Sequence, residues 1–300
     1  MFGFQRFGYG AAALLLASSA FHVVVYAFDG GGWDGPVSWR KPILFGFAFG
    51  VTLISLVWIA GRSRLGDRRG RWLVGTLAVA SLAETALIDL QRWRGVPSHL
   101  NFGTPVDAAV SAVLAAVAIV GLIPPIVVIT VVAWRRFDSP SMRLAVRSGL
   151  VVLLLSLVSG AALIANGRAI AVPPEATDLS IFGAAGQLKV PHAVTLHAVQ
   201  VLPVLAGVLA LSGWSEAARV RLVAVAAAGY GGVVLVSVLQ AAQGLAPGDL
   251  TVLSGVLLVV SATALAGSGV AALGRLRRRD RDDHGLPRSA TWFTIGGRRG

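Results

Sequence analysis

Long apolar runs, separated by short polar segments, dominate the chain. Eight runs extend over about 20 residues each and are found at about 8–28, 42–61, 72–91, 107–133, 145–166, 193–212, 218–240 and 250–273. Because a helix rises about 1.5 Å per residue, roughly 20 apolar residues cross a hydrocarbon core about 30 Å thick. Strands of a membrane barrel would alternate polar and apolar residues instead. The pattern predicts an all-α, polytopic membrane helix bundle with about eight transmembrane helices.

Composition supports this prediction and narrows the possible chemistry. The mean hydropathy is +0.75, and only 13% of the residues are charged. The chain has no cysteine, which excludes disulfides, Cys-ligated zinc and iron–sulfur clusters. A bound metal would therefore need histidine, carboxylate or carbonyl ligands.

The basic residues are distributed unequally between the two sides of the predicted bundle. The side that contains both termini carries 20 of the 26 lysines and arginines, namely Arg6 and those in segments 62–71, 134–147, 213–221 and 275–300. Lysine and arginine concentrate in the cytoplasmic loops of membrane proteins. We therefore expect both termini to be cytoplasmic, as an even number of crossings requires.

Two segments outside the apolar runs need an interpretation. We expect one transmembrane bundle over residues 1–274 and a basic, disordered cytoplasmic tail over 275–300, because the tail is polar and mixed in charge. Beyond the lipid bilayer itself, anionic lipid headgroups are the partner expected for the tail. We expect no nucleic-acid binding, since such clusters usually follow a last helix. The longest connection, 167–192, is either an ordered outer loop or a plain connector.

Two sequence features predict details of helix packing. The stretch "GFAFG" at 46–50 has small residues four apart, a spacing that lets two helices approach closely in a membrane. Pro124 and Pro125 lie inside the fourth run, where proline removes backbone donors and kinks a helix. This kink would either act as a hinge or only shape the bundle.

Few ionisable side chains lie within the apolar runs, and each costs about 2.5–3.5 kcal/mol to insert at the centre of a helix. The rise of a helix places His22 about 22 Å and Glu84 about 18 Å from the cytoplasmic boundary. His197 lies a short distance inside the outer boundary of the hydrocarbon core, in the sixth run. We expect these three residues to form one polar centre in the outer half of the bundle, as candidate ligands of a cofactor or a metal ion.

A second polar group is expected around this centre, from the outer ends of the helices and the outer loops. Glu84 and Gln91 are seven residues apart and share one stripe of their helix, and His197 and Gln200 share another. We expect His192 to lie in the loop or at the level of the headgroups. The members of this group are Lys41, Asp89, Gln91, Arg94, His99, Asn101, Asp107, His192 and Gln200.

Simpler structural roles explain some of the same residues. His22 would then be a core histidine bonded to a backbone carbonyl, and Glu84 would form an ion pair with a neighbouring helix. Asp89 and Arg92 are three apart on one helix and would form a local pair. The joint placement of these residues in the outer half favours a shared site.

Three stretches together resemble a family of multi-pass bacterial membrane proteins: "SWRKPILFGFAFG", "RGVPSHLNFGTPVD" and "LKVPHAVTLHAVQVLP". In that family a KP-containing segment, an RG-x-x-SHFN-x-x-TP-x-D segment and an H-x-x-x-LHA-x-Q-x-LP segment follow in this order. The match spans roughly residues 36–205, and Leu100 replaces the aromatic residue of the pattern. The resemblance implies a location in the bacterial cytoplasmic membrane and supplies site positions but no chemistry. These positions are Lys41, Arg94, Ser98, His99, Asn101, Asp107, His192, His197 and Gln200.

Four functions are compatible with these residues. The leading hypothesis is a redox or accessory protein in which His22 and His197 hold a haem, or join Glu84 around a metal ion. In a proton-coupled transporter the same residues would form a proton relay. An intramembrane enzyme acting on lipid would use the Ser, His and Asp residues near 98–107. A sensor or assembly partner would need no chemistry.

Overall fold

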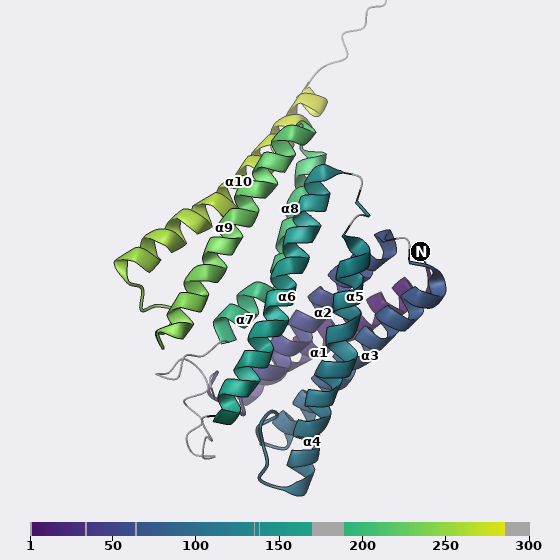
Figure 1. The fold of residues 1–300 in the computed structure, drawn as a ribbon, viewed down its shortest axis with the longest axis vertical. Coiled ribbons are helices and arrows are strands. Elements are labelled where there is room, and N and C mark those ends of the chain that lie inside the picture. Colours follow the sequence, from purple (N-terminus) through teal and green to yellow (C-terminus); the bar gives the residue numbers. More distant parts are fainter. Residues whose placement is uncertain are drawn as a thin grey trace, which may run out of the picture.

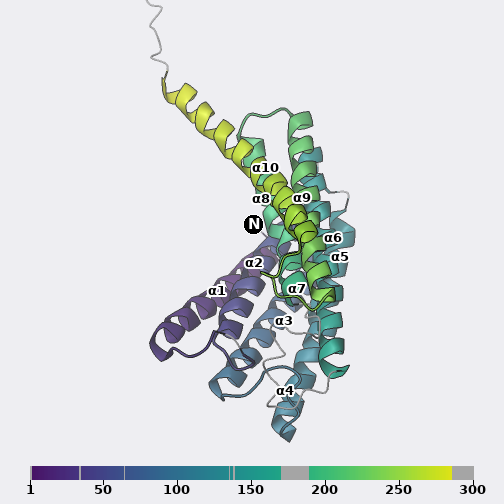
Figure 2. The ribbon, with the colours of Figure 1, turned by 90° about the vertical axis from the view of Figure 1, so that its left-hand side faces the viewer.

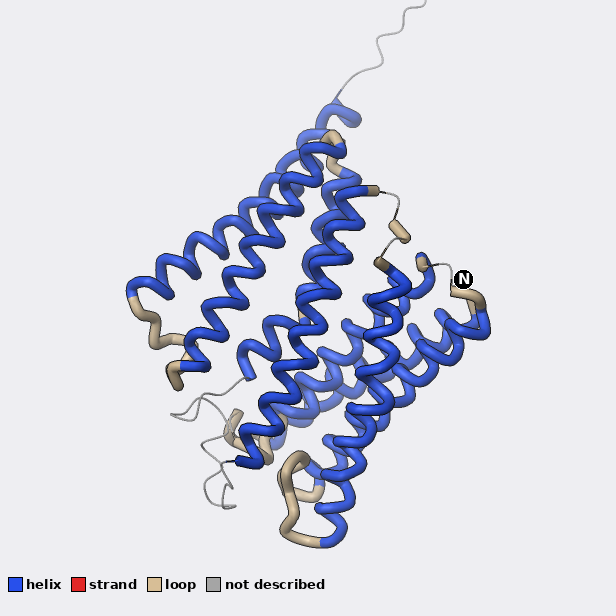
Figure 3. The backbone as a smooth tube through the Cα atoms, viewed as in Figure 1, coloured by secondary structure: helices blue, strands red, loops and turns tan. Residues whose placement is uncertain are grey.

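In this computed structural model, helices form every regular element of the residues that are described (Figure 3). The structure describes residues 2–33, 35–63, 65–134, 136–137, 139–169 and 189–285, without the side chains of 166–169 and 278–285. The elements are α1 (Gly3–Asp29), α2 (Arg40–Arg62), α3 (Asp67–Trp93), α4 (Pro105–Ala116), η1 (Val117–Leu122), α5 (Ile123–Ala133), α6 (Pro140–Ala169), α7 (Lys189–Leu196), α8 (Ala198–Leu211), α9 (Glu216–Ala242) and α10 (Val252–Gly285).

Eight helical spans within the described residues are long and apolar enough to cross a membrane. Two of the eight are composite, because α4, η1 and α5 form one span and α7 and α8 form another. These spans coincide with the eight apolar runs, so the prediction of an all-α membrane bundle is confirmed. Length and apolar character decide this outcome, since an isolated polar backbone group in lipid is costly and a helix satisfies its own.

Successive spans run in opposite directions and divide the bundle into two ends (Figure 1). One end holds the α2–α3, α5–α6 and α8–α9 connections together with the last turns of α10; we refer to it as the arginine-rich end. The other end holds the α1–α2, α3–α4 and α9–α10 connections; we refer to it as the opposite end.

Arginine and tryptophan side chains pair repeatedly at the arginine-rich end. The guanidinium of Arg62 lies 4.6 Å from the ring centre of Trp58, and that of Arg147 lies 5.1 Å from the ring of Trp134. Indole rings favour the boundary between hydrocarbon and water, and arginine gains a cation–π attraction there. This pairing fits an end of the bundle that meets a layer of lipid headgroups.

Two buried apolar clusters form the interior. The larger joins α1, α2, α3 and α5 to one face of α6, with fully buried Leu56 and Ile129 among its members. The smaller joins α6, α8, α9 and α10, around Leu202 and Leu209. Helix α10 lies at the edge of the bundle and crosses α9 (Figure 2), so much of its surface is left for lipid.

The close approach predicted from "GFAFG" occurs between α1 and α2. A Cβ atom built on Gly46 would lie 2.8 Å from the backbone oxygen of Leu15, and one built on Gly50 would lie 3.3 Å from that of Ala12. The hydroxyl of Ser19 donates a hydrogen bond across this contact to the carbonyl of Ile43 at 2.7 Å. The absence of a side chain at these glycines is therefore what brings the two backbones together.

The double proline is accommodated by a change in helix type. Residues Val117–Leu122 form the π-helix η1, and Pro124 and Pro125 follow in the first turn of α5. A proline at the start of a helix loses little, because the first N–H groups of a helix have no intrahelical acceptor. Gly121 lies against α3, where an added Cβ would approach that of Ala80 to 2.6 Å.

The sixth span, expected over 193–212, extends over Lys189–Leu211 and contains a break of one residue. Helix α7 ends at Leu196, His197 adopts a turn, and α8 begins at Ala198. The amide of Gln200, in the orientation that satisfies both of its ends, donates to the carbonyls of Leu196 and His197 and accepts from Thr52 of α2. The carbonyl of His197 also accepts from the backbone N–H groups of Gln200 and Val201 at 3.2 and 3.1 Å, so the polar groups at the interruption are satisfied inside the bundle.

The ends of two predicted segments differ from the expected boundaries. Helix α10 continues to Gly285, past the expected end of the bundle at residue 274, and residues 286–300 lie outside the described residues. The long connection is helical at both ends, since α6 reaches Ala169 and α7 starts at Lys189. Residues 170–188, on which the choice between ordered loop and plain connector rests, lie outside the described residues.

Candidate functional site

His22 is buried, and both nitrogens of its ring are occupied. Its Nδ1 lies 2.9 Å from the carbonyl oxygen of Ser18, which can only accept, and its Nε2 lies 3.2 Å from the indole N–H of Trp93, which can only donate. These partners select the neutral Nδ1–H tautomer. The ring therefore has no free lone pair for a metal ion, and the simpler explanation, a core histidine bonded to a carbonyl, is confirmed.

Aromatic and charged side chains join α1, α2 and α3 around His22. The rings of Trp39 and Trp93 lie 5.0 Å apart, and the guanidinium of Arg92 lies 3.7 Å from the ring centre of Trp39. Asp29 accepts a hydrogen bond from the indole of Trp39 at 2.6 Å and lies 3.5 Å from Arg92. Packing and pairing account for each of these groups.

Asp89 and Arg92 do not form the local pair expected from their spacing. The hydroxyl of Ser18 on α1 donates to Asp89 at 3.0 Å, whereas Arg92 turns toward Asp29. A carboxylate on a neighbouring element reaches Arg92 in this geometry, so the tertiary contact replaces the intrahelical one.

The three residues expected to form one polar centre have different neighbours. His22 contacts Trp93, Glu84 contacts His99, and the ring of His197 faces Phe47. No group of three histidine, aspartate or glutamate side chains among the described residues is arranged to hold a metal ion. The metal-binding and haem hypotheses therefore lose their support, because matching depth along separate helices did not bring these side chains together.

Glu84 instead forms a site with the loop that follows α3. The glutamate is 4% exposed, and its Oε1 lies 3.4 Å from Nε2 of His99, an ion pair when the imidazole carries a second proton. The other carboxylate oxygen, Oε2, is buried and has no hydrogen-bond partner in the described part of the chain. This oxygen is an acceptor that remains open.

Ser98 and Lys41 extend the contact away from Glu84. The Oγ atom of Ser98 lies 3.0 Å from Nδ1 of His99 and accepts a hydrogen bond from the ammonium group of Lys41 at 3.2 Å. The ring of Phe45 lies 5.9 Å from that of His99 and covers it. Lys41, Ser98, His99 and Glu84 thus form a continuous series of polar contacts from α2 to α3, which we call the polar chain.

Asp107 fixes the loop that carries Ser98 and His99. It lies at the start of α4, where it accepts hydrogen bonds from Arg94 at 2.8 Å, Gln91 at 3.1 Å and the hydroxyl of Thr104 at 2.7 Å. Thr104 is also the N-cap of α4, since its hydroxyl accepts from the backbone N–H of Asp107, and Pro105 follows at a position that favours helix initiation. The acid therefore ties both ends of the 94–104 loop together.

Asn101 and Leu100 shape the tip of the same loop. The side chain of Asn101 donates to the carbonyl of Pro97 at 3.2 Å and accepts from the N–H of Gly103 at 3.1 Å. Leu100 has φ of 55°, a left-handed conformation that costs free energy in a residue other than glycine. The surrounding hydrogen bonds hold this turn, which directs His99 back toward the bundle.

We expect that Asp107→Ala lowers the apparent melting temperature in detergent by several degrees, because Arg94 and Gln91 lose their shared acceptor. Amide hydrogen exchange over 94–104 should rise in the same variant. Asp107→Asn keeps an acceptor oxygen without the charge and should lie between wild type and Asp107→Ala. Equal amide exchange in wild type and both variants would contradict the proposal that hydrogen bonds to Asp107 hold the loop in its conformation.

His192, His197 and Gln200 contact residues outside the polar chain. His192 lies in helix α7, so the loop alternative is wrong, whereas a position at the level of the headgroups stays a prediction. Its Nδ1 lies 2.9 Å from the carbonyl oxygen of Ser156 on α6. His197 lines a hollow of about 330 Å³ with residues of α7, α9 and α10. Tyr230 lines it too, and its hydroxyl donates to the carbonyl of Val194 beside the break at 2.6 Å.

Most of the predicted outer polar group separates into local sets. Lys41 and His99 meet Glu84 and Ser98, and Gln91, Arg94 and Asn101 hold the loop with Asp107. His192 bonds to Ser156 of α6, whereas Gln200 bonds to Thr52 of α2. Reasoning from depth missed Ser98 and Tyr230, because a single hydroxyl in an apolar or loop segment carries no distinctive pattern. The resemblance and the enzyme hypothesis pointed to Ser98.

Comparisons with models of protein families, with curated proteins and with solved structures find no match to this chain. The resemblance drawn from the three motifs therefore gains no support from them. The fold itself defines the class: the chain is a multi-pass membrane protein, and eight helical spans among its described residues are each long and apolar enough to cross a bilayer.

Proposed function

We propose that this protein is a proton-coupled transporter of a bacterial cytoplasmic membrane, with Glu84 as its proton-binding group. The polar chain is the observation that carries the proposal. Carboxylate, imidazole, hydroxyl and ammonium groups can each pass or hold a proton, and series of such groups within membrane spans are typical of proton relays. The buried Oε2 of Glu84 has no donor among the described residues and is the natural end point for an incoming proton.

The exposure of the two central groups supports access from the opposite end of the bundle. The side chain of His99 is 25% exposed, whereas that of Glu84 is 6% exposed. A proton arriving from solvent would therefore meet the imidazole first. The excess of basic residues at the arginine-rich end supports a cytoplasmic assignment for that end, so the proton would enter from outside the cell.

The broken sixth span supports transport over a purely structural role. Transporters commonly bind their substrates where a membrane helix is interrupted, because the interruption places polar backbone atoms inside the bundle. The break at His197 lies beside a hollow of about 330 Å³ that Tyr230 also lines. The π-helix η1 in the fourth span is a second irregularity of the kind found at functional sites.

The order of Ser98, His99 and Glu84 also resembles a nucleophile with its base and orienting acid. Ser98 is only 2% exposed, so a substrate carbonyl would not reach its hydroxyl in this arrangement. The burial of the hydroxyl favours the relay over an enzyme.

Infrared spectroscopy of the purified protein tests the relay without knowledge of the substrate. We expect a protonated carboxyl band that Glu84→Gln removes and that shifts quickly after transfer to D₂O. His99→Gln should slow this shift at least severalfold, because glutamine keeps a polar contact but does not take up and release a proton under these conditions. His192→Gln is the matched control and should exchange like wild type. Equal exchange rates in wild type, His99→Gln and His192→Gln would refute a route through His99.

A further inference from the structure

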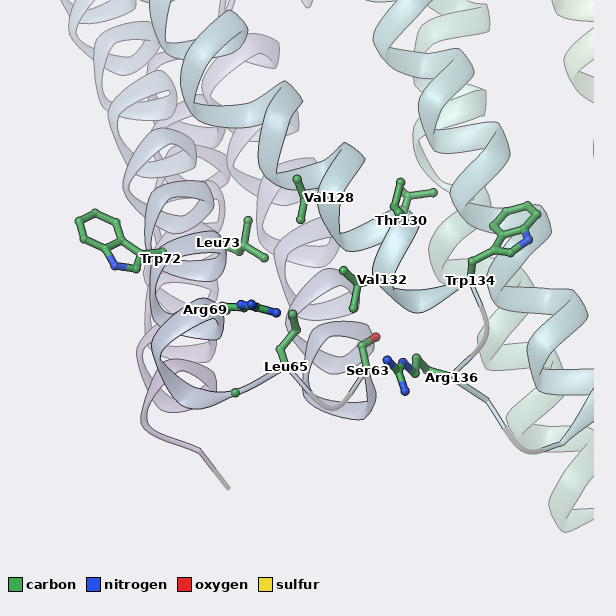
Figure 4. A pocket seen from close by; sticks show the side chains of 12 residues that line it. Ser63, Leu65, Arg69, Trp72, Leu73, Val128, Thr130, Val132, Trp134 and Arg136 are labelled. Carbon is green, nitrogen blue, oxygen red and sulfur yellow. The ribbon is translucent and has the colours of Figure 1, made fainter.

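A second, larger hollow lies at the arginine-rich end, between the α2–α3 connection and the end of α5 (Figure 4). Its volume is about 1000 Å³, which is ample for part of a lipid or another organic molecule. It is remote from the polar chain, which lies at the opposite end of the same helices. The proton-binding site therefore does not account for it.

Two arginines supply the free polar groups of this hollow. Arg69 reaches it from the first turn of α3 and Arg136 from the segment after α5, on the other side of Ser63 and Leu65 (Figure 4). Both are exposed, and neither has an ion-pair partner in the part of the chain that the structure describes. Among the residues that the structure describes, no aspartate or glutamate lines the hollow.

The hydroxyl groups that line the hollow donate their hydrogen bonds to backbone carbonyls. Ser63 donates to the carbonyl of Ile59 at 2.7 Å, and Thr130 donates to that of Ile126 at 2.8 Å. Both bonds are internal to their helices, so neither hydroxyl contributes its proton to a ligand. The polar chemistry offered to a ligand is thus that of two guanidinium groups, which recognise phosphate with paired N–H donors.

An apolar wall adjoins the two arginines. Val128 and Val131 of α5 line the hollow and are 40% and 70% exposed, and Leu73 of α3 contributes from the facing helix. Trp72 and Trp134 flank the site on its two outer sides (Figure 4), and indole rings favour the depth of the headgroups. The site thus combines positive charge at headgroup level with exposed apolar side chains deeper in the span.

We propose that this hollow binds an anionic phospholipid, with the phosphate between Arg69 and Arg136 and an acyl chain along Val128 and Val131. Charge complementarity selects an anionic headgroup, because both arginines lack an ion-pair partner among the described residues and attract it, and no described carboxylate lines the hollow. The apolar wall selects a lipid over a soluble anion, which would gain nothing from the valines. Basic hollows between membrane helices are suited to lipid headgroups for these reasons.

Native mass spectrometry of the delipidated full chain tests the site with phosphatidylglycerol, phosphatidylcholine and inorganic phosphate as separate probes. Wild type should retain phosphatidylglycerol in preference to phosphatidylcholine. Arg69→Gln combined with Arg136→Gln should weaken phosphatidylglycerol binding roughly 30-fold, since each arginine near a headgroup contributes about a factor of five. The control, Arg68→Gln with Arg221→Gln, removes the same charge from exposed arginines outside the hollow and should bind like wild type.

A second variant separates the acyl contact from the charge. Val128→Trp fills the apolar part and leaves both arginines, so it should also weaken retention of phosphatidylglycerol severalfold. Equal losses in the control pair and in the Arg69/Arg136 pair would overturn the proposal in favour of general surface charge. Competition of inorganic phosphate with the lipid at similar concentrations would overturn it in favour of a soluble anion.

Discussion

Glu84→Gln is expected to abolish solute-driven proton uptake in proteoliposomes while solute binding persists. Glutamine has nearly the shape of glutamate and can keep the contact with His99, but it cannot bind and release the proton that the coupling needs. The measurement uses vesicles that contain a pH-sensitive dye, at a clamped membrane potential. A gradient of one solute at a time is applied, inward or outward, from a panel of small sugars, amino acids and organic anions.

Asp249→Asn is the matched control for Glu84→Gln. Asp249 lies in the exposed α9–α10 connection at the opposite end, so its replacement makes the same carboxyl-to-amide change outside the helices. This variant should couple like wild type. Solute uptake by wild type without any movement of protons, or unchanged coupling in Glu84→Gln, would refute the proposed function.

Gly46→Val is expected to lower the free energy of unfolding by about 3 kcal/mol or more, and to reduce the yield of folded protein. The first added carbon would lie 2.8 Å from the backbone oxygen of Leu15 and 3.1 Å from Cβ of Ser19. Because a backbone atom cannot turn aside as a flexible side chain can, the two helices must separate, and overpacking of this kind costs about 1–3 kcal/mol even where side chains adjust. Chemical unfolding in mixed micelles measures the loss.

Gly75→Val tests whether the effect comes from the contact or from valine in a helix. Gly75 is also inside a membrane span, and a Cβ built on it meets no heavy atom within 4 Å. Its replacement should change the free energy of unfolding by only a few tenths of a kcal/mol, the difference in helix propensity. Similar losses at both positions would show that the α1–α2 contact is not specific.

The sequence determined the class of fold, because hydrophobic length is a local property. Each run of about 20 apolar residues must satisfy its backbone internally to enter a bilayer, and only a helix does this within one segment. The helix-packing role of Gly46 and Gly50 was readable for a similar reason, since a four-residue spacing of small residues places them on one face. The side of each terminus remains a prediction from charge.

The polar sites could be predicted less well from the sequence. It identified the polar side chains that lie within apolar helices, but not which of them contact one another. The rise of each helix gives the level of a residue in the membrane, and it places His22, Glu84 and His197 at similar levels. It does not give the rotation of one helix against another, which decides whether these side chains meet. His22 turned out to be fully bonded to Ser18 and Trp93. Glu84 found its partner in His99, on a loop whose conformation depends on Asp107.

The sequence by itself thus determined which segments are long and apolar enough to cross a membrane and which residues are expensive to bury. Only the tertiary structure decided which of those residues meet, that the sixth span breaks at His197, and that Arg69 and Arg136 border one hollow. The physical reason is the separation along the chain of the residues that interact. Hydrophobic burial and backbone hydrogen bonding within a span depend on neighbours along the chain, whereas a site between helices depends on rotation, close approach and loop geometry that many distant contacts fix together.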